Sequence, residues 1–156
     1  MTGCKYKMGV TLVEILIVVS IITILASMVI GMATRIGNQS KEKSLQDTFA
    51  LLESALEEYR EHEGAFPDGV DPDPNVNSEI LYEALYSIPG SRKILEQISD
   101  SLIADKGGPS DTPEIYDPWG TILLYVYAPA QGDNFPELKS AGPDKNFGNT
   151  DDISSK

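Results

Sequence analysis

The distribution of apolar residues divides the first 63 positions into two helical halves. An uncharged apolar run covers residues 15–30 and approaches the length that crosses a bilayer. Farther on, apolar residues recur at alternating spacings of four and three, the pattern of one helix face: Leu45, Phe49, Leu52, Leu56 and Tyr59. Because no proline precedes Pro67, we predict one helix, with a membrane half at 10–33 and an amphipathic half at 34–63.

The middle of the chain predicts loops and short helices. Pro72 and Pro74 make residues 68–77 an irregular loop. Apolar spacing then predicts two short helices, at 78–86 and 91–105, separated by a proline and a glycine. The apolar face of the amphipathic half of the long helix is expected to pack on the C-terminal domain, and His62 is expected to be a solvated residue near the helix end.

The last third of the chain predicts strands. Asp117-Pro118-Trp119-Gly120 has turn chemistry and leads into residues 121–127, which are rich in strand-forming side chains. A weaker, edge-like strand is expected at 135–140, and Trp119 is expected in the core. The sequence therefore predicts an α+β fold for residues 64–156, in which the long N-terminal helix packs on a small antiparallel β-sheet.

Charge and cysteine content narrow the function. The chain has 24 acidic and 12 basic side chains and a formal net charge of −12. Nucleic-acid binding depends on Lys and Arg at phosphates, so this balance argues against a nucleic-acid partner. The one cysteine is Cys4. With one histidine and no phosphate-binding loop or metalloprotease motif, the sequence also argues against an enzyme.

A single carboxylate, Glu14, lies at the start of the apolar run. A charge in a spanning segment costs about 2.5–3.5 kcal/mol on insertion scales, so such a residue marks a functional site and calls for a partner. The natural partner of a carboxylate is an amine. Because an unpaired buried charge is costly, the pairing would make assembly of such helices depend on register.

The segment Gly9-Val10-Thr11-Leu12-Val13-Glu14 resembles the processing site of type IV prepilins and type II secretion prepseudopilins. The resemblance implies that a prepilin peptidase cuts between Gly9 and Val10, removes residues 1–9 as a leader and methylates Val10. It also implies that Glu14 meets the N-terminal amine of a neighbouring subunit. Losing Lys5 and Lys7 with the leader would move the side-chain charge from −12 to −14.

Acidic residues are concentrated in the loop at 140–153, together with glycine and asparagine. Three of them, Asp144, Asp151 and Asp152, are the oxygen donors that a calcium ion prefers. The spacing is not that of an EF-hand, because the glycine and the twelfth position do not match. A solvated acidic tail is the other interpretation of this segment.

Together with Asp117-Pro118-Trp119-Gly120, this loop resembles the C-terminal calcium loop of major pseudopilins. The resemblance implies a Ca²⁺ site. Its carboxylate ligands would be Asp144, Asp151 and Asp152, and its backbone carbonyl ligands would be Ala141 and Asn149.

These resemblances imply a structural subunit that polymerises through its apolar helix into a pseudopilus of a type II secretion system and drives protein export. The subunit would cross the bacterial inner membrane once and place its C-terminal domain in the periplasm. Its partners would be further copies of itself, the prepilin peptidase, minor pseudopilins and the inner-membrane assembly platform. Two alternatives remain: a type IV pilin of a surface fibre, and a membrane-anchored, calcium-dependent binding module that never polymerises.

Overall fold

The structure, a computed structural model, describes residues 11–69, 71, 73–106, 109–127 and 135–156. The chain forms two compact units, Met1–Gln39 and Ser40–Lys156. The predicted leader, with Gly9 and Val10, lies outside the described residues, so the structure does not test the predicted cleavage site.

The long N-terminal helix is confirmed as α1, Leu12–Glu63. The apolar stripe predicted for its second half is buried, with Leu45, Leu52 and Leu56 fully inaccessible to solvent. His62 is exposed as expected, and its Nδ1 lies 2.8 Å from a carboxylate oxygen of Glu63. The amphipathic half of α1 therefore supplies one wall of the core of the second unit.

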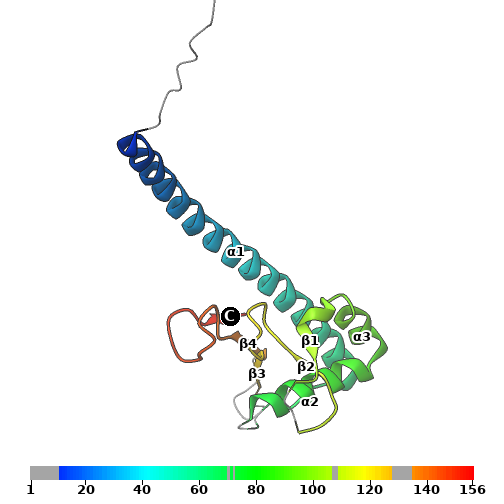
Figure 1. Ribbon diagram of the computed structural model, residues 1–156. Helices are drawn as coiled ribbons and strands as arrows, with labels where there is room; N and C mark the ends of the chain where they lie inside the picture. Colours follow the sequence, from blue (N-terminus) through cyan, green and yellow to red (C-terminus); the bar gives the residue numbers. More distant parts are fainter. Residues whose placement is uncertain (1–10, 70, 72, 107–108, 128–134) are drawn as a thin grey trace, which may run out of the picture. The chain divides into compact units, whose positions relative to one another are not determined.

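The rest of that core comes from elements that surround this part of α1 (Figure 1). Helices α2, Pro74–Ser87, and α3, Pro89–Leu95, contact each other. Helix α2 also contacts strands β2, Glu114–Ile115, and β3, Leu124–Val126. Core side chains outside α1 include Leu81, Leu85, Leu95, Ile98, Ile115, Trp119, Leu123, Tyr125 and Leu138. Trp119 is buried, as predicted.

Helix α2 begins earlier than the sequence pattern indicated, so the prediction of a loop through residue 77 was wrong. Asp73 is the N-cap, and its side chain accepts a hydrogen bond from the backbone N–H of Asn75 (2.9 Å). Pro74 occupies the first turn, where the missing N–H costs nothing and the fixed φ suits the helix. Ser78 does not cap the helix; its buried Oγ accepts from the backbone N–H of Ile115 (2.9 Å) and ties α2 to β2.

The helix predicted at 91–105 was also wrong in its extent, because α3 ends at Leu95. Tight turns follow, with the N–H of Ile98 donating to the carbonyl of Leu95 (3.0 Å). A 3₁₀ turn, η1, covers Asp100–Leu102 and leads into β1, Ile103–Ala104. Apolar residues three apart are buried in these turns as they would be in an α-helix, which is why the spacing predicted a longer one.

The strands form two small antiparallel sheets rather than one. In the first, β1 pairs with β2, Glu114–Ile115. In the second the order is β3, β4, β5, with β3 at Leu124–Val126, β4 at Glu137–Ser140 and β5 at Ile153–Ser154. The strands predicted at 121–127 and 135–140 are thus confirmed in shortened form. A long N-terminal helix followed by small antiparallel sheets is the predicted α+β, pilin-like arrangement.

Tyr125 connects the second sheet to the end of α1. Its ring is fully buried and its hydroxyl donates to the carbonyl of Pro67 (2.7 Å). Burial raises the pKa of Tyr125 above its ordinary value, so the hydroxyl is protonated and able to donate. A side chain at Gly69 would place its Cβ 2.5 Å from this ring, so only glycine allows the close approach.

Candidate functional site

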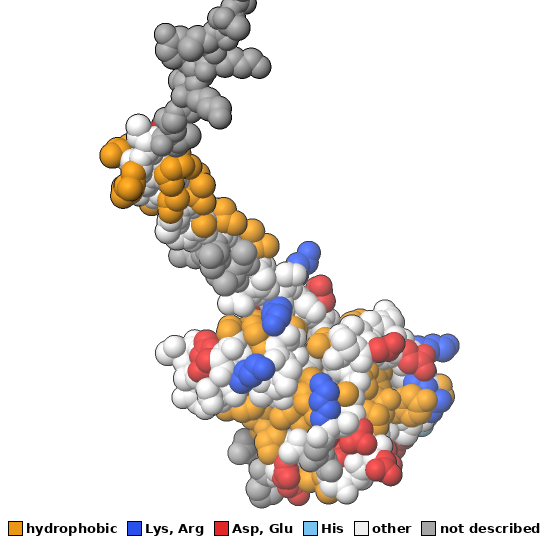
Figure 2. Space-filling view, in the orientation of Figure 1, with side chains coloured by type: hydrophobic (Ala, Val, Ile, Leu, Met, Phe, Trp, Pro, Cys, Tyr) orange, Lys and Arg blue, Asp and Glu red, His pale blue; other side chains and the backbone are white. Residues whose placement is uncertain are grey.

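The first candidate site is the apolar start of α1. Among the described residues, Leu12–Val29 is the one segment that is long and apolar enough to cross a membrane, with a mean hydropathy of 2.7. Its large apolar side chains are exposed, and Figure 2 shows them along the N-terminal part of α1. At about 1.5 Å per residue the segment is about 27 Å long, which matches the hydrocarbon core of a bilayer.

Glu14 lies in the first turn of this helix, and Thr11 caps it. The backbone N–H of Glu14 donates to Thr11 Oγ1 (3.2 Å), and the N–H of Ile15 donates to the Thr11 carbonyl (3.3 Å). Thr11 and Glu14 thus occupy the N-cap and N3 positions, and this hydrogen bond is the N-cap half of a capping box. The Thr-x-x-Glu spacing is itself a local sequence signal for this helix start. Glu14 therefore lies at the helix N-terminus, where a negative charge is stabilising.

The hydroxyls within the apolar segment are satisfied inside the helix. Ser20 donates to the Leu16 carbonyl (2.8 Å) and Thr23 to the Val19 carbonyl (2.7 Å). Such back-bonding meets the demand that lipid makes on polar groups, because hydrocarbon offers them no partner. Glu14 is then the one charged side chain in the Leu12–Val29 segment.

Comparison with protein families matches residues 5–30 to the prokaryotic N-terminal methylation motif. The chain is prepilin-like. The matched residues include both predicted cleavage residues, Glu14 and the whole Leu12–Val29 segment, and the motif implies processing by a prepilin peptidase. The motif belongs to structural, non-enzymatic pilin-like proteins, which confirms the prediction that the chain is not an enzyme. No curated protein and no solved structure gives a significant match.

The second candidate site in this prepilin-like chain is the C-terminal loop, residues 141–152, which connects β4 to β5. Its start is anchored by a buried carboxylate whose role the sequence pattern did not indicate. Asp117 Oδ1 accepts from the backbone N–H groups of Trp119 (3.0 Å) and Thr121 (2.8 Å) and so fixes the predicted turn. Its Oδ2 accepts from the Ser140 hydroxyl (2.6 Å), and Ser140 Oγ accepts from the N–H of Gly142 (3.0 Å).

The two ends of the loop meet at a glycine. Gly142 has a φ of 67°, and a Cβ there would overlap the backbone oxygen of Asp151. A side chain would thus clash with backbone, and the positive φ would add strain. Asp117 and Gly142 together hold the loop closed on itself.

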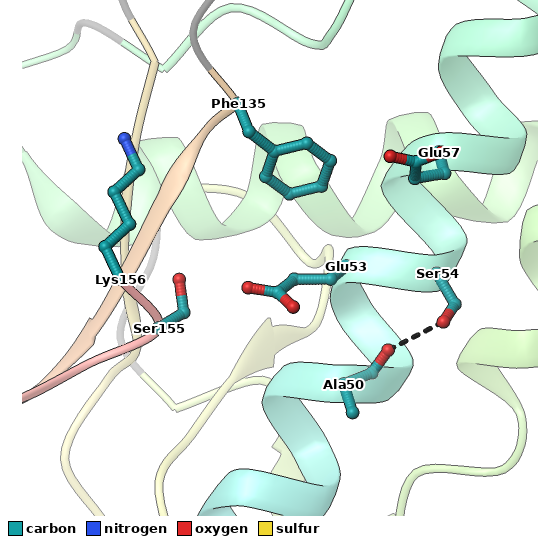
Figure 3. A pocket seen from close by; sticks show the side chains of 7 residues that line it. All are labelled: Ala50, Glu53, Ser54, Glu57, Phe135, Ser155 and Lys156. Atoms are coloured by element: carbon teal, nitrogen blue, oxygen red, sulfur yellow. Dashed lines mark hydrogen bonds between the residues drawn. The ribbon is translucent and has the colours of Figure 1, made fainter.

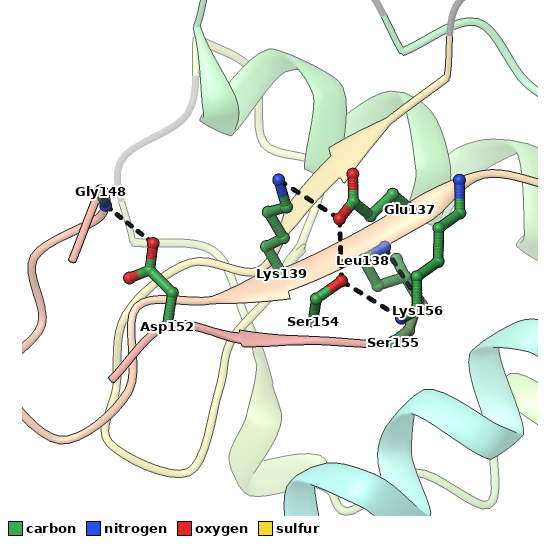
Figure 4. A network of polar contacts seen from close by, with 8 residues as sticks. All are labelled: Glu137, Leu138, Lys139, Gly148, Asp152, Ser154, Ser155 and Lys156. Carbon is green, nitrogen blue, oxygen red and sulfur yellow. Dashed lines mark hydrogen bonds and ion pairs between the residues drawn. The ribbon is translucent and has the colours of Figure 1, made fainter. Parts of the chain in front are cut away.

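The structure brings two of the predicted ligands, Asp144 and Asp151, next to each other. The N–H of Asp144 donates to Asp151 Oδ2 (3.3 Å), and Asn149 Nδ2 donates to Asp144 Oδ2 (2.7 Å). Asp152 points elsewhere, since its Oδ2 accepts from the N–H of Gly148 (2.8 Å; Figure 4). Ala141 is fully buried at the base of the loop.

The loop offers the oxygen atoms that a cation prefers, but its carboxylates do not lie close enough together to hold one in this conformation. The donors are all oxygens, and Asp152 Oδ1 is buried without a hydrogen-bond partner in the described structure. However, no three acidic, histidine or cysteine side chains in the described ranges lie close enough to hold a metal ion. The predicted set of Ala141, Asp144, Asn149, Asp151 and Asp152 therefore stays a prediction.

The sheet beside the loop has its own polar network (Figure 4). Glu137 Oε1 accepts from the Ser154 hydroxyl (2.8 Å) and lies 3.3 Å from Lys139 Nζ. Burial alone would raise the pKa of Glu137, but the Ser154 hydrogen bond and the Lys139 charge together hold it below its ordinary value. The network joins β4 to β5 without involving the loop carboxylates.

Replacing Asp117 by alanine should destabilise the second unit and release the loop. The change leaves the Trp119 and Thr121 N–H groups and the Ser140 hydroxyl without their acceptor, and each unsatisfied buried group costs about 1–3 kcal/mol. Thermal unfolding should show a clear fall in Tm, and limited proteolysis should cut within 141–152. The exposed Asp111→Ala is the control; equal stability of the two variants would contradict this role for Asp117.

Proposed function

We propose that this prepilin-like chain is a subunit of a helical filament, the pseudopilus of a type II secretion system. The observation that carries the proposal is the combination of the methylation motif with a membrane-length helix whose apolar side chains stay exposed among the described residues. Before assembly the bilayer covers that surface, and in a filament other copies of the helix cover it. The C-terminal domain would face the periplasm, and minor pseudopilins and the inner-membrane platform would be further partners.

Glu14 would set the register of assembly. A carboxylate at the entrance of an apolar bundle is compensated only when a cation lies beside it. Removal of residues 1–9 would create such a cation, the methylated amine of Val10, on every subunit. One copy would then offer its carboxylate to the amine of the next.

The acidic loop is proposed to bind Ca²⁺ through the five predicted residues. A bound cation would neutralise the neighbouring carboxylates of Asp144 and Asp151 and would give the partnerless Asp152 Oδ1 a counter-charge. This stabilisation matters because the one cysteine of the chain, Cys4, lies in the predicted leader, so that no disulfide can stabilise the mature fold.

The alternatives of a surface pilus and of a non-polymerising anchored module share the membrane anchor with the pseudopilus subunit and differ from it in how, or whether, the chain assembles.

The Glu14→Ala variant tests the filament proposal. Membrane insertion should be unchanged, because removing a charge favours the apolar phase, whereas assembly should fall sharply, because the intersubunit ion pair is lost. Membrane fractionation and chemical cross-linking of the full chain measure the two properties. Glu42→Ala, an exposed acid in the polar half of α1, is the matched control. Normal multimer yield from Glu14→Ala would count against the pairing.

Calcium dependence is tested by a double substitution, Asp151→Ala with Asp152→Ala. If the wild type binds, linkage stabilises it by about 2.7 kcal/mol at a hundredfold excess of calcium over Kd, and a chelator should lower its Tm. The double variant should show no such response. Asp100→Ala with Asp111→Ala, two exposed acids outside the loop, should respond like the wild type. A chelator effect of equal size in the loop variant would place the ion elsewhere.

A further inference from the structure

Helix α1 begins shortly after the predicted cleavage site. The predicted cut lies between Gly9 and Val10, and the first helical residue is Leu12. Thr11 stands between them; it is the first described residue and is not helical. Along the sequence, the scissile bond therefore precedes the helix by only Val10 and Thr11.

The sequence offers few signals that would make the helix begin at this point. Residues 1–10 contain no proline, so no residue there is unable to continue a helix. Gly9 is a weak stop, because a helical pattern tolerates a single glycine. The cap at Thr11 is the remaining signal, and it lies directly before the first helical residue.

The Thr11 hydroxyl is used differently from other hydroxyls of α1. Five of these donate to a backbone carbonyl three or four positions earlier at 2.7–2.8 Å, and Figure 3 shows one such bond, from Ser54 to Ala50. Thr11 Oγ1 instead accepts, from the backbone N–H of Glu14 (3.2 Å). The five donors continue a helix that already exists, whereas the Thr11 acceptor marks its start. The donors are Ser20, Thr23, Ser27, Thr48 and Ser54.

Loss of this cap is expected to lengthen the helix. A helix start without a cap leaves backbone N–H groups without acceptors. Unwinding the first turn of an apolar segment is costly in a membrane, because hydrocarbon offers the freed groups no partner. Adding a turn at the N-terminal end instead moves the unpaired N–H groups towards the headgroups and water. The uncapped helix would therefore extend towards Gly9.

We propose that Thr11 is a positioning residue for the prepilin peptidase, because its cap makes the helix begin after the scissile bond. A peptide bond inside a helix is engaged in the helical hydrogen bonds, and a protease cleaves the opened form in proportion to its population. The proposal rests on processing at the predicted cut, for which the methylation motif provides the support. It depends neither on filament assembly nor on calcium.

A series of substitutions at Thr11 tests the proposal through the order of their effects. Thr11→Val keeps the branched shape but lacks the acceptor, and Thr11→Ala lacks it too. Both should be cleaved about fivefold more slowly, the factor that corresponds to the loss of a typical N-cap. Thr11→Ser and Thr11→Asn keep a capping oxygen and should match the wild type, and Thr11→Gly should come close to it. The rate of leader removal is measured on the full chain in membranes that contain a prepilin peptidase.

Thr23→Val is the matched control, because it makes the same atomic change in the same helix. Its hydroxyl donates to the Val19 carbonyl and caps nothing, so cleavage should be unchanged. Normal cleavage of Thr11→Val together with slow cleavage of Thr11→Asn would show that the peptidase reads side-chain shape, and would overturn the proposal. A wild type that is never cleaved would overturn the predicted cut and the proposed function as well.

The position of the helix start gives a second readout. Backbone chemical shifts of the full chain in detergent micelles report which residues are helical. In the wild type the helical shifts should begin at Leu12, and in Thr11→Val they should extend to Val10 and Gly9. Slow cleavage of Thr11→Val with a helix that still begins at Leu12 would contradict a role through the cap.

Discussion

The apolar surface of Leu12–Val29 is the constraint on which the rest of this molecule depends. Apolar side chains exposed over that length are unfavourable in water, since each buried CH₂ contributes about 0.8 kcal/mol. The described part of the chain offers nothing of its own to cover them. By length and composition the segment suits a bilayer or contact with other helices, and the proposed function has it pass from the first to the second.

After residue 40 the same helix is part of a folded core. There its apolar stripe narrows to one face, and Leu45, Leu52 and Leu56 are buried under the second unit. The remaining faces are charged and exposed, which leaves them available for contacts between copies. One helix thus combines a membrane-length apolar segment with a core element, and under the proposed function it is also the assembly surface.

Buried polar groups give the second unit its specific form. Asp117 links a turn, a strand end and the C-terminal loop, and Ser78 links α2 to β2. Tyr125 links the second sheet to the segment after α1. Each group is satisfied by a partner distant in sequence, so each one fixes a tertiary contact that apolar packing alone would leave loose. The small sheets need such links because their strands are only two to four residues long.

Features that depend on local sequence were predictable, and those that depend on distant partners were not. Helix α1, the turn at Asp117 and the fold class follow from periodicity and turn chemistry. The start of α2 was missed although Asp73 and Pro74 carry a local cap signature, because two prolines so close together indicated a loop. Strands β1, β2 and β5 were missed because two residues carry no period. The anchoring role of Asp117 became visible only when Ser140 was brought beside it.

The N-terminal end of the chain, which lies outside the described residues, holds the most direct test. The intact mass of the protein extracted from the membranes of its native host reports whether residues 1–9 have been removed and whether Val10 carries a methyl group. A mass equal to residues 10–156 plus one methyl is the expected result for a filament subunit with a free, modified amine facing Glu14. An unprocessed chain from Met1 to Lys156 would contradict that function and favour a membrane-anchored module that does not assemble.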